Sequence, residues 1–96
     1  MATVVLAASA VADLDRLIAT HSLPGNSREC VRAVLKALST FPLLGPALSG
    51  AWQEFRFVLG PWPWMLIVYV FDEEAGRVAV VTIQDARSAR SATSQR

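Results

Sequence analysis

The feature that most constrains the fold is an unbroken apolar run in the second half of the chain. Residues 65–71 read Met-Leu-Ile-Val-Tyr-Val-Phe, and most of them are β-branched or aromatic. A run of this length and composition is typical of a strand that is covered on both faces. Gly60, Pro61 and Pro63 stand just before it and exclude a long helix across that point. The run therefore predicts a buried central strand.

A second strand is predicted directly after a short polar turn. Residues 72–76 read Asp-Glu-Glu-Ala-Gly, and the glycine is free to adopt a positive φ. Residues 77–84 then form another run rich in β-branched residues. Because the connection is too short for a crossover helix, the two runs are expected to form an antiparallel hairpin.

The first half of the chain predicts two helices. In residues 10–20 apolar side chains recur at helical spacing, with Ser9 as a candidate N-cap. In the second segment Asn26 and Glu29 are placed as in a capping box, and Pro42 stops the helix. The predicted apolar stripe of this second helix consists of Val31, Val34, Leu35, Leu38 and Phe41. Since only about five residues separate the helices, they are expected to pair as an antiparallel hairpin.

Two further strands complete the predicted architecture. Residues 3–6 are short and β-branched and could form an edge strand. Residues 54–59 also read as a strand, with Phe55, Phe57 and Leu59 on one face and Glu54, Arg56 and Val58 on the other. The leucines of the apolar loop between helix and strand (Leu43, Leu44 and Leu48) are expected over the edge of the core. The prediction is a single α+β domain over residues 1–96, with a frayed tail at 91–96. Its small antiparallel sheet has the order β-α-α-β-β-β, and the N-terminal helical hairpin packs on one face.

Composition leaves two explanations for the high apolar content. Hydrophobic residues make up 53% of the chain and charged residues only 18%. The excess indicates either a surface that a partner covers or a tightly packed sheet core. The net charge of +1 is unevenly distributed, because residues 77–96 carry four arginines against Asp85 alone. The C-terminal end is therefore the place to expect an anionic partner.

Other classes of protein are disfavoured by what the sequence contains. Cys30 is the only cysteine, so there is no disulfide framework and no metal-spaced Cys/His set, and no metal or cofactor is expected. A reducing, cytoplasmic setting fits this usage. The N-terminal residues lack the basic region of a signal peptide, and the apolar stretch at 58–71 is too short and too interrupted to span a bilayer. No membrane association is predicted.

Several short phrases, taken in order, resemble a known family. Residues 10–18 read Ala-Val-Ala-Asp-Leu-Asp-Arg-Leu-Ile, and residues 38–45 contain a helix-ending Leu…Pro…Gly step. Residues 48–52, followed by Phe55 and Arg56, read as an entry into a strand, and the phrases at 68–70 and 85–87 complete the set. Together they span almost the whole chain. Their order and spacing resemble the RelE/ParE superfamily of bacterial toxins from type II toxin–antitoxin pairs.

The resemblance implies a small toxin that inhibits growth and that a cognate antitoxin neutralises. RelE-like members cleave mRNA in the ribosome, which would make this chain a metal-independent endoribonuclease. ParE-like members inhibit DNA gyrase and are not known as nucleases, so gyrase is an alternative partner. A third interpretation is a non-toxic protein-binding domain of the same fold. Ribosome-dependent mRNA cleavage is the leading prediction.

The predicted catalytic residues are cations near one end of the sheet. Metal-free RNA cleavage needs a base, an acid and cations that stabilise the charge of the transition state. We assign the cationic role to Arg56 and Arg87, with Arg90 in support, and expect the first two to meet. The family match underlies these assignments. His21, the only histidine, is expected in the helix–helix loop and far from the arginines.

Other residues depart from the nuclease pattern or have two interpretations. Met65 stands where nuclease members commonly place a basic residue, and an apolar side chain cannot hold a phosphate. Tyr69 lies mid-strand and is expected in the core rather than in catalysis. Trp62, Trp64 and Met65 are the predicted partner-binding residues, although tryptophans could also plug the open end of the sheet. Three further cations, Arg28, Arg32 and Lys36, lie along one face of the second predicted helix. This face could contact the phosphates of a nucleic acid, but an ordinary solvent-exposed face is the preferred interpretation.

Overall fold

The computed structural model describes residues 1–88, and its centre is the predicted hairpin. Strands β3 (Met65–Asp72) and β4 (Arg77–Asp85) pair antiparallel. The turn between them uses Gly76 at φ +61°, and the Asp72 carboxylate accepts the backbone N–H of Ala75. Residues 65–69 of β3 are fully buried, so both faces of the central strand are covered as predicted.

The sheet has four strands in the order β1-β4-β3-β2. Strand β2 (Arg56–Leu59) pairs antiparallel with β3, and β1 (Thr3–Leu6) joins the free edge of β4. The α+β class and the strand–helix–helix–strand order are confirmed. The antiparallel description is wrong for β1, which runs parallel to β4 and makes the sheet mixed. A parallel neighbour requires a long connection, and the two helices supply it.

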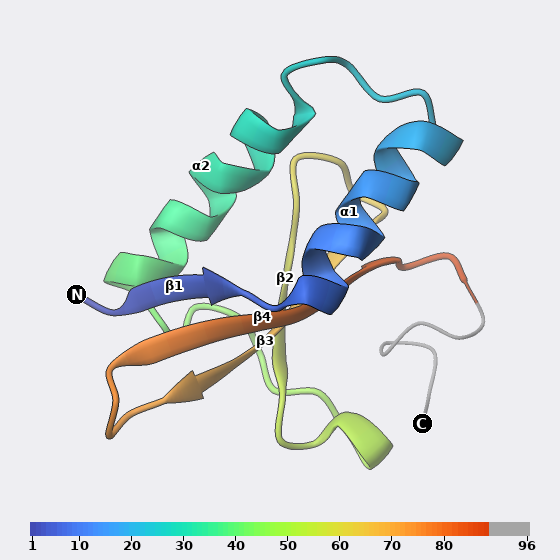
Figure 1. Cartoon of the computed structure of the whole chain (residues 1–96). Coiled ribbons are helices and arrows are strands. Elements are labelled where there is room, and N and C mark those ends of the chain that lie inside the picture. The colour runs from blue at the N-terminus through green and yellow to red at the C-terminus, as the bar shows by residue number, and fades with distance from the viewer. Residues whose placement is uncertain (89–96) are drawn as a thin grey trace.

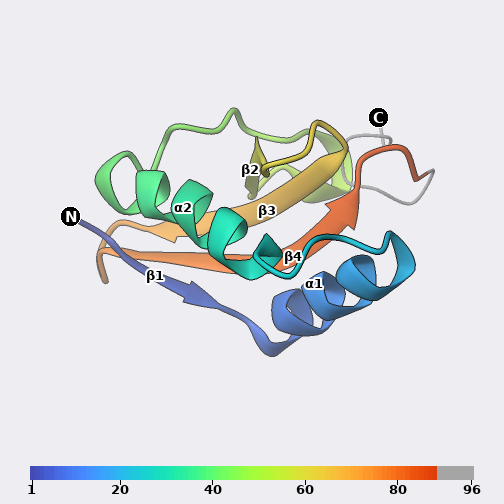
Figure 2. The same cartoon turned by 90° about the horizontal axis from the view of Figure 1, so that it is seen from above.

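Both helices cover the same face of the sheet (Figure 1). Helix α1 (Ala8–Thr20) packs mainly against β4, and α2 (Ser27–Thr40) also contributes its apolar stripe to the core. The helices diverge from each other instead of packing along their length (Figures 1 and 2). The helix-side core comprises Ala10, Leu14, Leu17, Val31, Leu35, Leu38, Met65, Ile67, Tyr69, Val78, Val80 and Ile83.

The opposite face is covered by the segment that connects α2 to β2. In Figure 1 this segment passes below the sheet and forms one turn of 3-10 helix at Gly50–Trp52. Leu48 is buried there against Leu66 and Val68 of the central strand. Residue Ala47 also forms an isolated bridge with Arg56, so the outer edge of β2 is partly paired. This second core explains why an unbroken apolar run is needed in β3.

Several local predictions need correction. The N-cap of α1 is Ala7, and Ser9 lies inside the helix, where its hydroxyl donates to the Val81 carbonyl at 2.6 Å. Asn26 is the N-cap of α2 but makes no capping hydrogen bond through its side chain, so no capping box forms. Leu43 and Leu44 are exposed together with Phe41, because the chain leaves the sheet as α2 ends.

Neither helix could cross a membrane. Within residues 1–88, no helix combines the length and the apolar composition that a bilayer-spanning segment needs.

Candidate functional site

Strand β4 ends at Asp85, beside a rigid tryptophan-bearing turn. Asp85 lies opposite Met65, and the Ala86 N–H donates to the Trp64 carbonyl at 2.7 Å. Two backbone hydrogen bonds close the turn: Gly60 N–H to the Met65 carbonyl and Met65 N–H to the Trp62 carbonyl. Pro61 and Pro63 fix the backbone on either side of Trp62. The turn therefore holds two indole rings at the end of the sheet.

His21 reaches the same place from the end of α1. The helix closes with a Schellman-type turn in which the Leu23 N–H donates to the Ile18 carbonyl and Ser22 adopts φ +52°. The His21 ring stacks on Trp64, with centroids 4.3 Å apart and planes tilted by 31°. Its Nε2 lies 3.5 Å from Oδ2 of Asp85. Since Arg87 binds the same carboxylate, the expectation that His21 stays far from the arginines is wrong for Arg87.

Arg87 completes the cluster. Its Nε and Nη2 donate to the two oxygens of Asp85 at 2.9 and 2.8 Å, and its backbone N–H donates to Oδ1. The guanidinium also lies over the Trp64 ring, 5.3 Å from its centroid. The side-chain hydrogen bonds from Arg87 lower the pKa of Asp85 from 3.8 to about 2. Asp85 is consequently ionised at neutral pH, and its carboxylate lies beside both the His21 imidazole and the Arg87 guanidinium. We call His21, Trp64, Asp85 and Arg87 the β4-end cluster.

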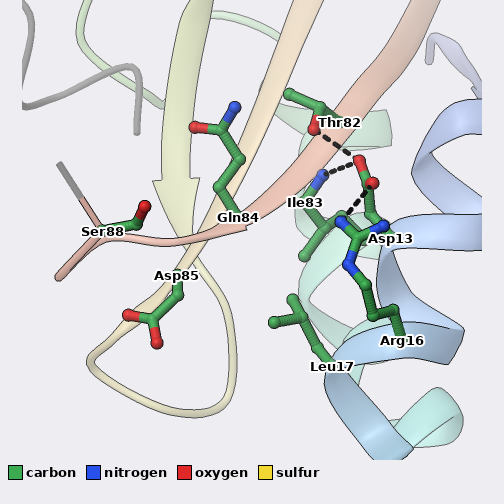
Figure 3. A pocket seen from close by; sticks show the side chains of 8 residues that line it. All are labelled: Asp13, Arg16, Leu17, Thr82, Ile83, Gln84, Asp85 and Ser88. Atoms are coloured by element: carbon green, nitrogen blue, oxygen red, sulfur yellow. Dashed lines mark hydrogen bonds and ion pairs between the residues drawn. The ribbon is translucent and has the colours of Figure 1, made fainter. Parts of the chain in front are cut away.

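A cavity of about 360 Å³ adjoins the β4-end cluster and shares Asp85 with it. Figure 3 shows helix α1 forming one wall and the end of β4 the other, with Asp13 and Asp85 on opposite sides. Its volume falls within the range of small-ligand pockets. The lining residues are Asp13, Arg16, Leu17, Thr82, Ile83, Gln84, Asp85 and Ser88.

Asp13 joins the two walls of this cavity. Its Oδ2 accepts the Thr82 hydroxyl at 2.5 Å and the Ile83 backbone N–H at 3.3 Å, and its Oδ1 accepts Arg16 at 2.8 Å (Figure 3). These bonds tie the middle of α1 to β4 next to the bulge in its pairing with β3. Asp13 thus fixes the distance between helix and strand, and with it the position of His21 two turns further along α1.

The structure separates the two arginines that we expected to meet. Arg56 lies opposite Tyr69 on β3, whereas Arg87 follows Asp85, which pairs with Met65. The two partner positions on β3, Met65 and Tyr69, are four residues apart, or about 13 Å along the strand. The half-buried Arg56 donates to the Gly45 carbonyl at 2.8 Å and anchors the loop below the sheet. Its catalytic assignment remains a prediction.

The other predicted site residues have mixed outcomes. Arg90 lies outside the described residues. Met65 is completely buried in the helix-side core, where a partner cannot contact it, so the prediction that Met65 binds a partner is wrong. Trp62 and Trp64 are half-buried and stack with ring centroids 6.2 Å apart. Tyr69 is fully buried, as expected, and its hydroxyl accepts the Gly45 N–H at 2.9 Å.

No metal-binding constellation is evident in the described part of the chain. Among residues 1–88, no three His, Cys, Asp or Glu side chains gather closely enough to hold a metal ion. What the β4-end cluster does offer is an imidazole, a carboxylate and a guanidinium beside stacked aromatic rings. This combination suits proton transfer and the binding of an anion with flat, stackable groups.

The Asp85–Arg87 pair predicts a small acid dependence of stability. Since the pKa of Asp85 is depressed in the folded chain, the pair contributes above pH 4 and its contribution is lost as the pH falls towards 2. The Tm of Arg87→Ala should therefore lie below that of the wild type near pH 6, and the gap should close by pH 2. Because the pair faces solvent, we expect only a small difference in Tm.

Thermal melts monitored by circular dichroism at several pH values measure this effect. Arg32→Ala, on the exposed face of α2, serves as the control and should show no pH-dependent gap. A gap for Arg87→Ala that stays constant from pH 6 to pH 2 would contradict the role given to the pair.

Comparison with solved structures gives the class of the fold. A chain of the intact RelBE toxin–antitoxin complex of Escherichia coli superposes with a TM-score of 0.68 at 14% identity, covering 92% of this chain and all of that one. A metal-bound toxin of Helicobacter pylori gives 0.67 at 22% identity, with 88% and 94% covered. A chain of the RelBE2 toxin–antitoxin complex of Mycobacterium tuberculosis gives 0.61 at 22% identity, with 88% and 96% covered.

The sequence itself matches no protein-family model and has no significant match among curated proteins. At such low identities the structural likeness establishes the fold. The chain therefore has the α+β fold of RelE-type toxins, and the resemblance seen in the sequence is confirmed at that level.

Proposed function

We propose that this protein is the toxin of a type II toxin–antitoxin pair and that it inhibits growth by cleaving mRNA on the ribosome. The observation that carries the proposal is the β4-end cluster. It places a guanidinium, a carboxylate and an imidazole beside stacked indoles, on a fold otherwise seen in toxins. Each of these groups has a use in cutting a single-stranded RNA.

In this proposal Arg87 stabilises charge on the scissile phosphate. RNA cleavage by the neighbouring 2′-hydroxyl builds negative charge on the phosphate oxygens, and a positioned guanidinium offsets it. Asp85 and Trp64 hold Arg87 from two sides, so little ordering is needed during the reaction. The indole faces of Trp62 and Trp64 are available to stack on nucleobases, which requires no particular base sequence.

Inhibition of DNA gyrase without catalysis is the second candidate. The observation in its favour is the burial of Met65 at the start of β3, where the nuclease pattern has a cation. An inhibitor of gyrase would use the same surface for protein contacts and would not need His21 or Arg87 as reacting groups.

An antitoxin is the proposed partner under either mechanism. The divergence of α1 and α2 opens an apolar groove of about 290 Å³, floored by Leu6, Val11, Leu14, Val31 and Leu35. Asp15, Arg28 and Arg32 are its charged lining residues, and Asp15 forms an ion pair with Arg28. The remaining charge of Arg32 favours an amphipathic segment with an acidic side chain. Coverage of this groove accounts for part of the apolar excess noted in the sequence.

Mapping new mRNA 5′ ends after brief induction in bacteria tests the nuclease proposal. We expect growth arrest with new ends inside translated regions, and loss of at least about 100-fold in their abundance for Arg87→Ala. Arg77→Ala, a matched removal of an exposed arginine, should cut like the wild type. Co-expression of the small open reading frame adjacent to this gene should restore growth.

The other outcomes overturn the proposal in different ways. Growth arrest without new 5′ ends, accompanied by relaxed plasmid DNA, would indicate that gyrase is the target. Cleavage that survives Arg87→Ala would refute the role of the β4-end cluster. Absence of any growth arrest would leave a non-toxic binding domain.

A further inference from the structure

We infer that His21 is the group that takes the proton from the attacking 2′-hydroxyl, and that Asp85 and Trp64 position it. This inference rests on the proposed nuclease function and adds a residue from the helix–helix connection to it. His21 is the only histidine of the chain, and its imidazole is 29% exposed, so a substrate can reach it. Imidazole is also the side chain best suited to exchange a proton near neutral pH.

Two contacts fix the orientation of the ring. Trp64 covers one ring face at a centroid distance of 4.3 Å, and Asp85 faces Nε2 at 3.5 Å. A carboxylate beside Nε2 favours the tautomer that carries its proton there, which leaves Nδ1 with a lone pair. Within residues 1–88 no hydrogen bond uses Nδ1. The structure therefore presents Nδ1 as the proton acceptor.

The proton acceptor and the cation stand next to each other. His21 Nε2 and Arg87 Nη2 both approach Oδ2 of Asp85, at 3.5 and 2.8 Å. A phosphodiester bound by Arg87 thus lies beside the imidazole, and its 2′-hydroxyl can approach Nδ1. Asp85 is a poor alternative base, because its pKa is lowered and Arg87 occupies both of its oxygens.

The proposed step transfers one proton to His21 and exchanges one phosphorus–oxygen bond for another. Nδ1 of His21 takes the proton of the 2′-hydroxyl as the 2′-oxygen forms a bond to phosphorus. The bond between phosphorus and the 5′-oxygen breaks, and its electron pair stays on the 5′-oxygen, which takes a proton from water. The products are a 2′,3′-cyclic phosphate, a free 5′-hydroxyl and a protonated imidazole, which Asp85 stabilises. Asp85 on β4 and Arg87 beyond it are the charged groups next to His21.

Single-turnover cleavage of mRNA on ribosomes by the purified full-length chain tests the inference. His21→Gln and His21→Phe should each slow the chemical step by about 100-fold or more, the second despite keeping a ring on Trp64. The wild-type rate should fall at acid pH, because a protonated imidazole cannot accept a proton, and both variants should lose this dependence. In His21→Ala, added imidazole should restore part of the rate, and Asp85→Asn should shift the pH profile.

The controls separate this inference from the proposed function. Arg77→Ala, which removes an exposed arginine at the start of β4, should match the wild type, and melting curves should show that the His21 variants remain folded. If Arg87→Ala is inactive but His21→Gln cleaves with the wild-type pH profile, His21 is not the base and the nuclease proposal stands. If His21→Phe retains the wild-type rate, the ring has only a packing role. If the wild type itself does not cleave, the proposed function fails.

Discussion

Replacing Gly45 with alanine is expected to destabilise the fold strongly. A Cβ at this position would lie 1.9 Å from the Phe57 carbonyl oxygen and 3.1 Å from the Tyr69 hydroxyl. The obstacle is backbone of β2 and cannot move aside without breaking the strand. Since overpacking of this kind costs about 3 kcal/mol, the Tm should fall by roughly 10 to 20 °C.

The loss at Gly45 would extend to the polar network around it. Its N–H donates to Tyr69, and its carbonyl accepts Arg56, so a shift of the loop leaves a buried hydroxyl and a half-buried guanidinium without their partners. Urea unfolding measures the effect. Gly25→Ala is the matched control, because a Cβ there meets nothing within 4 Å, and it should change stability by less than about 0.5 kcal/mol. Equal stability of the two variants would refute the steric argument.

The second large effect is expected for Asp13→Ala, which should cost about 2 kcal/mol. The substitution removes the acceptor of the Thr82 hydroxyl and of the Ile83 N–H, both part-buried between α1 and β4. Alanine has a higher helix propensity than aspartate. A loss of stability in this variant would therefore come from the missing hydrogen bonds between α1 and β4. Because Asp13 also sets the position of α1, the cleavage rate should fall together with stability.

Asp15→Ala provides the comparison for Asp13. Both residues lie in the same helix, but the Asp15 side chain is 52% exposed against 16% for Asp13, and its ion pair with Arg28 faces solvent. Exposed pairs contribute little, so the change should stay below about 1 kcal/mol. Urea unfolding of both variants decides the matter. A larger loss for Asp15→Ala than for Asp13→Ala would show that the α1–β4 connection has been misjudged.

Local patterns in the sequence were sufficient for the secondary structure and the fold class. The apolar run of β3 required cover on both faces, and the turn at Gly76 required a hairpin with β4. The helical stripe of α2 was predicted correctly for Val31, Leu35 and Leu38. These features depend on neighbours a few residues away, where side-chain periodicity and backbone preferences are decisive. They also made the resemblance to RelE-type toxins visible at low identity.

The tertiary structure alone decided which chemical groups meet. The sequence determined that His21 ends α1 and that Asp85 ends β4, but not that these two ends coincide. They coincide because β1 runs parallel to β4 and α1 then runs from the end of β1 toward the side on which β4 ends (Figure 2). The direction of a short edge strand depends on how the helices cross the sheet, and no local pattern encodes it. The register between β2 and β3 places Arg56 away from Arg87, whereas the course of α1 brings His21 close to Arg87.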